Sequence, residues 1–367
     1  MTDLTTRAQT PTPLHARTAE LCATNSWAAQ HGFTVPNVYS SEREELEALA
    51  SRVVLSDLSA RQCWTFDGPD AGIYLSFATI TDVTTLEPGQ TTRTLWCDDQ
   101  GNARGDGTIV RFGKDQFELT TSVRDFAWML DGTLGFEVKV GNATGTRAVI
   151  GVKGRLASSL LSVAGFTGAP SNKGEVVQPT WRPAQIALMR DATGEGYELW
   201  TQADDGVVVW DRLWRSGAGL GVSPMGAAAL EMQRIENASP IAGIDWWPAQ
   251  LSPDLRDCRS PLDLGFTPDR LRCFNGADRV ARAVRSMRLV QVCADEAMIL
   301  GGLTARGAPA GTVTSQTWSE SRSRAFALAW IKEDAAKPGT QLMTSGSRGP
   351  VRAEIIRDAF SKLPGLV

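Results

Sequence analysis

The stretch LEPGQTTRTLWCDDQGNARGDGTIV, residues 86–110, contains two strand-like runs separated by turn-forming residues. The run TTRTLWC contains three threonines and a tryptophan, which are residue types typical of strands, and TIV consists of three β-branched residues. Asp106 and Gly107 stand between them, and Asp-Gly is a strong sequence signal for a tight hairpin turn. Taken alone, this dipeptide favours a turn role for Asp106 over a catalytic role.

Strand-like runs and helical segments are interspersed on both sides of this stretch. Ser41 and Glu44 have the spacing of a capping box, which predicts a helix start. The apolar face predicted for that helix consists of Leu46, Leu49, Ala50 and Val53. The order lacks the regular βαβ alternation of a doubly wound sheet, so we predict an α+β fold. Strand-like runs dominate from about residue 286, which predicts a separate β-rich C-terminal domain.

Composition and charge exclude several functional classes. The 367 residues are 42% hydrophobic and 21% charged, which is typical of a globular protein. The formal charge of -4 gives no long-range attraction to nucleic acid or to an anionic membrane, so a small-molecule partner is expected. The N-terminal residues lack the pattern of a signal peptide, and no window reaches the 18 apolar residues of a membrane span. We therefore expect a cytoplasmic protein that binds neither nucleic acid nor membrane.

Few side chains are available for acid-base or metal chemistry. Both histidines, His15 and His31, precede residue 32, which argues against a Ser-His-Asp site or a multi-histidine metal site. The six cysteines lie at least fifteen positions apart, so we predict free thiols and no zinc site. Carboxylates are therefore the expected acid and base groups.

Three further patterns have a structural and a functional interpretation. The glycine-rich segment 217–224 lacks the spacing of a dinucleotide-binding fingerprint. The arginine-rich segment 269–288 predicts a solvated helix face in preference to a nucleic-acid patch, because the chain is acidic overall. Most tryptophans are expected in the core, but five stand beside polar or turn positions where they could form an aromatic wall for a planar ligand: Trp96, Trp200, Trp210, Trp246 and Trp247.

The order of several segments resembles the aminomethyltransferase family, which comprises the glycine-cleavage T-protein and its relatives. GFTVPNVY is followed by a helix, by VVLSDLSARQCWTFDGPDA and then by residues 86–110, as in that family. Further segments resemble family motifs in the same order, namely RAVIGVKGRLASSLL, DATGEGYEL, LEMQRIEN, SPLDLGF and GTVTSQTWSESRSRAFALAWI. The resemblance covers roughly residues 31 to 360, and its fixed order is more specific than any one motif.

The resemblance implies a T-protein-like fold that binds tetrahydrofolate. Residues 14–278 would form the folate-binding catalytic region, as two intertwined α+β subdomains, and residues 279–367 a C-terminal β-barrel. Asp106 matches the second aspartate of the family's Asp-Asp pair, its catalytic carboxylate, whereas Gly105 replaces the first. Glu198 matches the glutamate that accepts two hydrogen bonds from the pterin, and Arg234 of LEMQRIEN is assigned to cofactor binding.

This sequence departs from the family pattern at positions where substrate would lie. The family arginine of Ala-Arg-Asp is Leu230, and the tyrosine of Gly-Tyr-Thr-Gly is Ala192. The folate-side tyrosine is Arg93, and the segment Ser-His-Met is Ser59-Ala60-Arg61. These changes argue against the aminomethyl-lipoyl arm of H-protein as donor. Because a guanidinium pairs readily with a carboxylate, Arg93 suggests a small anionic methyl or aminomethyl donor.

Several functions remain open at this point. Within one-carbon transfer, the chain could be a demethylase of an N-, O- or S-methyl compound or a divergent T-protein. A folate-binding accessory protein of iron-sulfur assembly shares this fold, but only part of its Lys-Gly-Cys-Tyr-x-Gly-Gln-Glu motif survives in residues 272–278. A family scaffold without catalytic activity is the third alternative.

Overall fold

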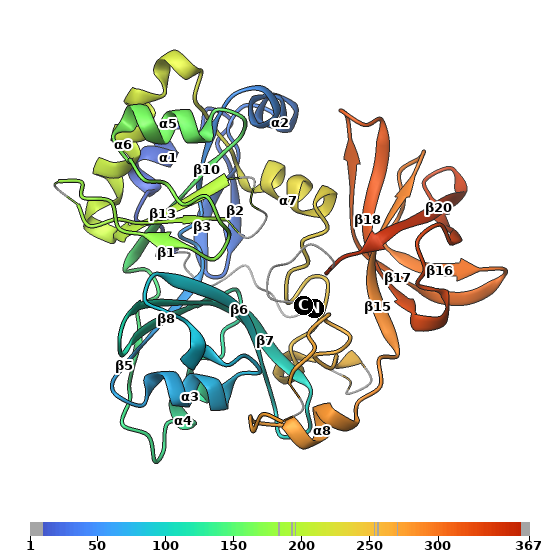
Figure 1. Ribbon diagram of the computed structural model, residues 1–367. Coiled ribbons are helices and arrows are strands. Elements are labelled where there is room, and N and C mark those ends of the chain that lie inside the picture. The colour runs from blue at the N-terminus through green and yellow to red at the C-terminus, as the bar shows by residue number, and fades with distance from the viewer. Residues whose placement is uncertain are drawn as a thin grey trace.

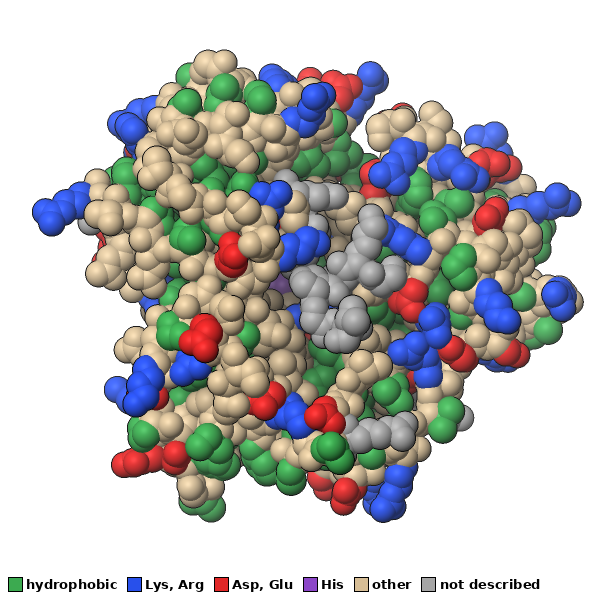
Figure 2. Space-filling model, in the orientation of Figure 1, with side chains coloured by type: hydrophobic (Ala, Val, Ile, Leu, Met, Phe, Trp, Pro, Cys, Tyr) green, Lys and Arg blue, Asp and Glu red, His purple; other side chains and the backbone are tan. Residues whose placement is uncertain are grey.

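The computed structural model describes residues 10–182, 184–191, 194, 196–252, 254, 257–269 and 271–360. Over these residues the chain forms two lobes of mixed helix and strand and a third lobe that is a β-barrel (Figure 1). The predicted α+β class and the C-terminal barrel are therefore confirmed. Basic and acidic side chains are interspersed over the face shown in Figure 2, as the small net charge suggests.

The first lobe contains a mixed six-stranded sheet whose strands come from distant parts of the chain. The strand that comes first in the chain is β4 (Val54–Asp57). After it the chain builds the whole second lobe and returns to this sheet about ninety residues later, at β10 (Arg147–Lys153). Two helices, α5 (Ala157–Ala164) and α6 (Gly206–Ser216), contribute Leu160, Trp210 and Leu213 to the core of this lobe. In sheet order the strands are β11 (Val176–Val177), β12 (Ala187–Arg190), β13 (Gly196–Gln202), β10 (Arg147–Lys153), β4 (Val54–Asp57) and β14 (Ser223–Pro224).

The second lobe is an antiparallel five-stranded sheet with helices α3 (Ala71–Ala78) and α4 (Phe126–Asp131). Its core contains the fully buried Trp64, Trp96 and Leu95. In sheet order its strands are β6 (Gln90–Cys97), β7 (Ala103–Gly113), β8 (Gln116–Thr121), β5 (Gln62–Asp67) and β9 (Lys139–Asn142).

The third lobe is a closed barrel, which leaves no open sheet edge. Its strands in order are β15 (Met287–Ala294), β18 (Arg324–Lys332), β17 (Ala308–Ser319), β16 (Gly301–Ala305), β19 (Gln341–Gly346) and β20 (Gly349–Asp358). Helix α7 (Ala227–Glu236) joins the barrel to the first lobe, because it packs against β17 as well as α2 (Glu42–Ser51) and β3 (Phe33–Val38). The remaining elements are α1 (His15–Leu21), α2 (Glu42–Ser51), α8 (Ala277–Arg282), β1 (Thr10–Pro11), β2 (Ser26–Gln30) and β3 (Phe33–Val38).

Two local predictions need correction. Ser41 caps α2 as predicted, because its hydroxyl accepts the N–H of Glu44 at 3.2 Å, but Ala50 is exposed and Glu45 is buried instead. The Glu45 carboxylate accepts backbone N–H groups of Tyr39 at 2.7 Å and Gly226 at 2.8 Å, so a polar side chain takes part in the buried face.

The arginine-rich segment 269–288 is also different from the prediction. Helix α8 covers only Ala277–Arg282, so the segment forms no long solvated helix face. Arg285 donates to the carbonyl of Leu262, and Arg288 lies on β15, where it pairs with Glu333 and Asp358. Arg270 lies outside the described residues.

Candidate functional site

Asp106 lies in the middle of β7, opposite Leu95 of β6. The hairpin between these strands turns earlier, where the Asp98 carboxylate accepts the backbone N–H groups of Gln100 at 3.0 Å and Asn102 at 2.8 Å. The turn interpretation of Asp106 is therefore wrong. A Cβ at Gly107 would lie 2.5 Å from the carbonyl oxygen of Thr120, so the glycine permits close approach of β8 rather than a turn.

The glycine on the other side of Asp106 explains one departure from the family pattern. A Cβ at Gly105 would lie 2.2 Å from a ring carbon of Trp96, which is fully buried and fixed by a hydrogen bond to Asp125. A second aspartate at this position would therefore require the core to be repacked.

Arg93 forms an ion pair with Asp106. Its Nη2 donates to Oδ2 of Asp106 at 2.6 Å, and the two side chains are 13% and 15% exposed. The guanidinium lies over the rings of Phe266 and Phe360, at 5.4 and 5.9 Å from their centroids. Among the described residues, Nη1 of Arg93 has no hydrogen-bond partner although it is buried. Burial of a donor without a partner costs free energy, so Nη1 of Arg93 is well placed to donate a hydrogen bond to an acceptor atom of a ligand.

Glu198 lies on β13 and is also paired with an arginine. Arg61 donates from Nη1 to Oε2 at 3.0 Å and from Nη2 to Oε1 at 3.3 Å, so the pair is bidentate. The indole Nε1 of Trp200 donates to the same Oε2 at 2.9 Å. The Arg61 Nε donates to the carbonyl of Leu58 at 2.9 Å. Arg93 and Arg61, which replace other residues of the family pattern, thus form ion pairs with the two carboxylates for which the family resemblance predicts a role.

Asp106 and Glu198 line two adjoining cavities. The cavity at Asp106 has a volume of about 300 Å³, and the one at Glu198 about 210 Å³. Together they are within the size range of small-molecule sites. Four residues line both cavities: Arg61, Arg93, Thr108 and Thr120.

The structure adds His31 to the Asp106 cavity, which the sequence alone did not indicate. Residues His31 and Gly32 have φ values of 49° and 92° and form the two-residue turn between β2 and β3, where Gln30 pairs with Phe33. Burial lowers the pKa of His31, and the nearby guanidinium groups of Arg124 and Arg61 lower it further. The imidazole is therefore held in its neutral form near neutral pH. The adjacent His31 and Gly32, residue types that tolerate positive φ, were a signal from which this turn could have been predicted.

Arg234 lines neither cavity. It pairs with Glu231 at 2.5 Å and with the buried Asp245 at 2.7 Å, and it donates to the carbonyl of Ser239 at 3.1 Å and the hydroxyl of Ser315 at 3.0 Å. These contacts fix the segment 239–245, and part of that segment, residues 240–242, lines the Asp106 cavity.

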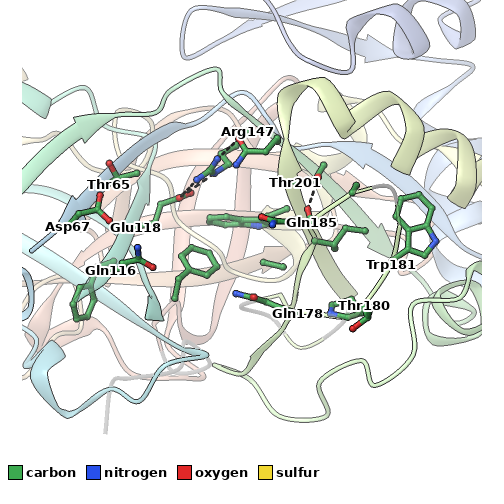
Figure 3. Close-up of a pocket in the computed structure, with 18 residues that line it drawn as sticks. Thr65, Asp67, Gln116, Glu118, Arg147, Gln178, Thr180, Trp181, Gln185 and Thr201 are labelled. Carbon is green, nitrogen blue, oxygen red and sulfur yellow. Dashed lines mark hydrogen bonds and ion pairs between the residues drawn. The ribbon is translucent and has the colours of Figure 1, made fainter. Parts of the chain in front are cut away.

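A larger cavity of about 700 Å³ lies outside this site. Figure 3 shows Glu118 and Arg147 pointing toward each other in it, with an ion pair of 3.0 Å. Trp200 lines both this cavity and the one at Glu198. The predicted aromatic wall is wrong for the other tryptophans, because Trp96, Trp210 and Trp246 are buried in cores and Trp247 is 47% exposed without lining either site cavity.

Other sequence-based expectations can be compared with the structure. The cysteines are free thiols, as predicted, and Cys273 is exposed in the segment 272–278, away from the walls of both site cavities. Within the described ranges, no group of three or more metal-ligating side chains could hold a metal ion. No helix in the described part of the chain is long and apolar enough to cross a membrane. Leu230 packs in α7, and Ala192 lies outside the described residues.

Two adjoining cavities of this size, each lined by a carboxylate paired with an arginine, are typical of a small-molecule-binding protein, and comparisons identify the family of the chain. Residues 14–252 match the GCVT N-terminal domain, and residues 287–362 match the glycine cleavage T-protein C-terminal barrel domain. The chain belongs to the aminomethyltransferase family, a family of folate-dependent enzymes of one-carbon transfer, so the predicted resemblance is confirmed.

Individual relatives support this assignment over nearly the whole chain. An aminomethyltransferase of Saccharopolyspora erythraea is 26% identical over 95% of this chain and 97% of its own length. One from Streptomyces coelicolor is 25% identical over 87% of this chain and 88% of its own length. A trimethylamine-oxide aldolase of Ruegeria pomeroyi is 30% identical over 64% of this chain, which is 32% of that longer protein.

A solved structure supports the fold. The glycine cleavage system aminomethyltransferase T from Bartonella henselae has a TM-score of 0.84 to this chain and 21% sequence identity. The similarity covers 97% of this chain and 99% of that one.

Proposed function

We propose that this chain catalyses tetrahydrofolate-dependent transfer of a one-carbon unit from a small methyl or aminomethyl donor that carries a carboxylate. The observation that carries the proposal is that Asp106 and Glu198 line adjoining cavities with common walls. Glu198 would accept the two donors of the pterin edge, with the Trp200 indole holding its carboxylate in place. The reactive end of the cofactor would then lie toward Asp106.

Bound tetrahydrofolate would supply the amine nitrogen that accepts the one-carbon unit. Asp106 would orient this region and take up the proton that the amine releases. The ion pair with Arg93 holds the carboxylate of Asp106 in a fixed orientation at the wall of the cavity. Because one nitrogen of Arg93 is already committed to Asp106 and Nη1 is buried without a partner among the described residues, Nη1 would bind the carboxylate of the donor.

Arg234 is proposed to support cofactor binding as a positioning residue. It fixes Ser239 and Asp245 at the two ends of a segment that lines the Asp106 cavity. Its own guanidinium is engaged by these groups and by Glu231, so an indirect role agrees better with its contacts than direct binding.

Incubation with tetrahydrofolate and a panel of methylated donors tests the proposal. The panel should pair each carboxylate-bearing donor with an uncharged analogue, and the assay should quantify 5-methyl- and 5,10-methylene-tetrahydrofolate. We expect product from carboxylate-bearing donors, and its loss in Asp106→Asn. Equal use of the uncharged analogues would remove the role of Arg93, and a folded protein that binds no tetrahydrofolate would contradict the whole proposal.

A further inference from the structure

We infer that Arg61 competes with the pterin of a reduced folate for the carboxylate of Glu198, and that it thereby sets the affinity of this chain for the cofactor. This inference rests on the proposed function. In the family pattern the position of Arg61 is the methionine of Ser-His-Met, which cannot form an ion pair. Here Arg61 holds both oxygens of Glu198, at 3.0 and 3.3 Å.

The number of acceptor positions makes the two interactions mutually exclusive. An ionised carboxylate offers about four lone-pair positions. Three of those on Glu198 are used by Nη1 and Nη2 of Arg61 and by Nε1 of Trp200. One position remains, and a pterin edge that donates two hydrogen bonds needs two, so the bidentate pair of Arg61 must break before the pterin can bind Glu198 in this way.

The guanidinium also has the shape of the group that it excludes. Two parallel N–H donors of the guanidinium form a bidentate pair with a carboxylate. The adjacent ring N–H and amino group of a pterin can form the same kind of pair. Arg61 is held by the carbonyl of Leu58 at 2.9 Å and lies 5.9 Å from the ring centroid of Trp200. These contacts keep Arg61 beside Glu198 when no pterin is bound.

The adjoining cavity gives the displaced side chain a place to go. Arg61 lines the Asp106 cavity as well as the Glu198 cavity, so a change of side-chain rotamer would move its charge between them without a change in the backbone. The side chains of Arg61 and Glu198 are 24% and 17% exposed, so water stays within reach of the separating charges.

Titration calorimetry with tetrahydrofolate tests this inference through binding alone. Arg61→Met should lower the dissociation constant by about tenfold, or about 1.4 kcal/mol, because the competitor is removed while Trp200 still holds Glu198. In a Glu198→Gln background the same substitution should change the constant by less than about twofold, since the contested carboxylate is gone. Arg288→Met is the matched control, because Arg288 is 28% exposed, pairs with two carboxylates and lies in the barrel. It should leave the constant unchanged.

The outcomes separate this inference from the proposed function. If the parent binds tetrahydrofolate and Arg61→Met binds equally or more weakly, the inference is overturned and the proposed function stands. If neither protein binds, both are overturned. Measurable binding by the parent and tighter binding by Arg61→Met support the inference. If that variant unfolds, Arg61→Lys repeats the test, because lysine keeps the charge but cannot form the fork; a smaller tightening is expected, and none would count against the inference.

Discussion

Replacement of Asp106 by asparagine separates a catalytic carboxylate from a structural one. Asparagine has nearly the same size and keeps an oxygen that can accept from Nη2 of Arg93, now 2.6 Å from Oδ2. What it loses is the negative charge and the capacity to take up a proton. The backbone demands no special residue here, because Asp106 lies within β7.

The structure sets the size of the two effects. Hydrogen bonds to charged groups contribute about 1.5–3 kcal/mol. Asparagine keeps a bond to the charged guanidinium but loses the ion pair, so stability should fall by part of that amount, roughly 1–2 kcal/mol. The pair is little screened, because its side chains are only 13% and 15% exposed. Loss of a general acid-base group should reduce turnover by roughly 10²- to 10⁴-fold. The stability loss is small beside the roughly 5–15 kcal/mol of a typical domain, so the variant should stay folded.

Turnover at saturating tetrahydrofolate and donor is the appropriate assay, with urea unfolding measured on the same samples. Asp125→Asn is the matched control. Asp125 forms a bidentate pair, at 2.6 and 2.9 Å, with Arg104, which lies on β7 as Asp106 does, and Asp125 lines neither cavity. This substitution should destabilise the protein at least as much, because Asp125 also accepts the Trp96 indole N–H, with little loss of turnover. If Asp106→Asn loses no more turnover than Asp125→Asn, the catalytic role of Asp106 is refuted.

Three further substitutions test other parts of the site. Arg93→Ala should raise the KM for a carboxylate donor by roughly 10- to 100-fold with little change in tetrahydrofolate affinity, and equal losses for both ligands would sink the assignment. Glu198→Ala should weaken tetrahydrofolate binding by roughly 10- to 100-fold in calorimetry, less than for a free carboxylate because the pterin must first displace Arg61. His31 has a pKa below its ordinary 6.5, so the unfolded chain binds more protons there and stability falls as the pH drops from above about 6.5 toward the folded-state pKa. His31→Asn, which tolerates the same left-handed backbone, should remove part of that loss in urea unfolding compared at about pH 7.5 and pH 5, and an unchanged difference would contradict it.

Sequence patterns can identify structural features that depend on hydrogen bonds between residues close together in the chain. Ser41 caps α2 because its hydroxyl meets an N–H only three residues away. The real turn before β7 also uses local bonds, from the Asp98 side chain to backbone groups within four residues. The face of α2 was predicted less well, because Glu45 is buried through bonds to Tyr39 and to the distant Gly226. Apolar periodicity cannot show that a carboxylate will find backbone donors elsewhere.

Asp106 shows how tertiary packing overrides a strong local signal. Asp-Gly favours a turn because both residues tolerate positive φ, but the same glycine is also the only residue that permits strands to approach closely. At Gly107 the glycine is required for close approach of the strands, because the backbone of β8 leaves no room for a Cβ. Without the register of β6, β7 and β8, the two uses of one dipeptide cannot be distinguished from the sequence.

The pairing of Asp106 and Glu198 with arginines was unpredictable for a different reason. Arg93 and Asp106 are diagonal neighbours across one hairpin, since Arg93 faces Thr108, so their contact follows once the strand register is known. Arg61 and Glu198 are 137 positions apart and meet through β10, which lies between β4 and β13 in the sheet. Because Arg61 follows β4 by only four residues, the fold that brings Glu198 to the site necessarily brings the residue after β4 beside it. A methionine at this position could not form an ion pair with Glu198, whereas Arg61 binds both oxygens of its carboxylate. If the pterin binds Glu198 as proposed, affinity for the cofactor would depend on Arg61, a position outside the Asp-Asp pair to which the family resemblance assigns catalysis.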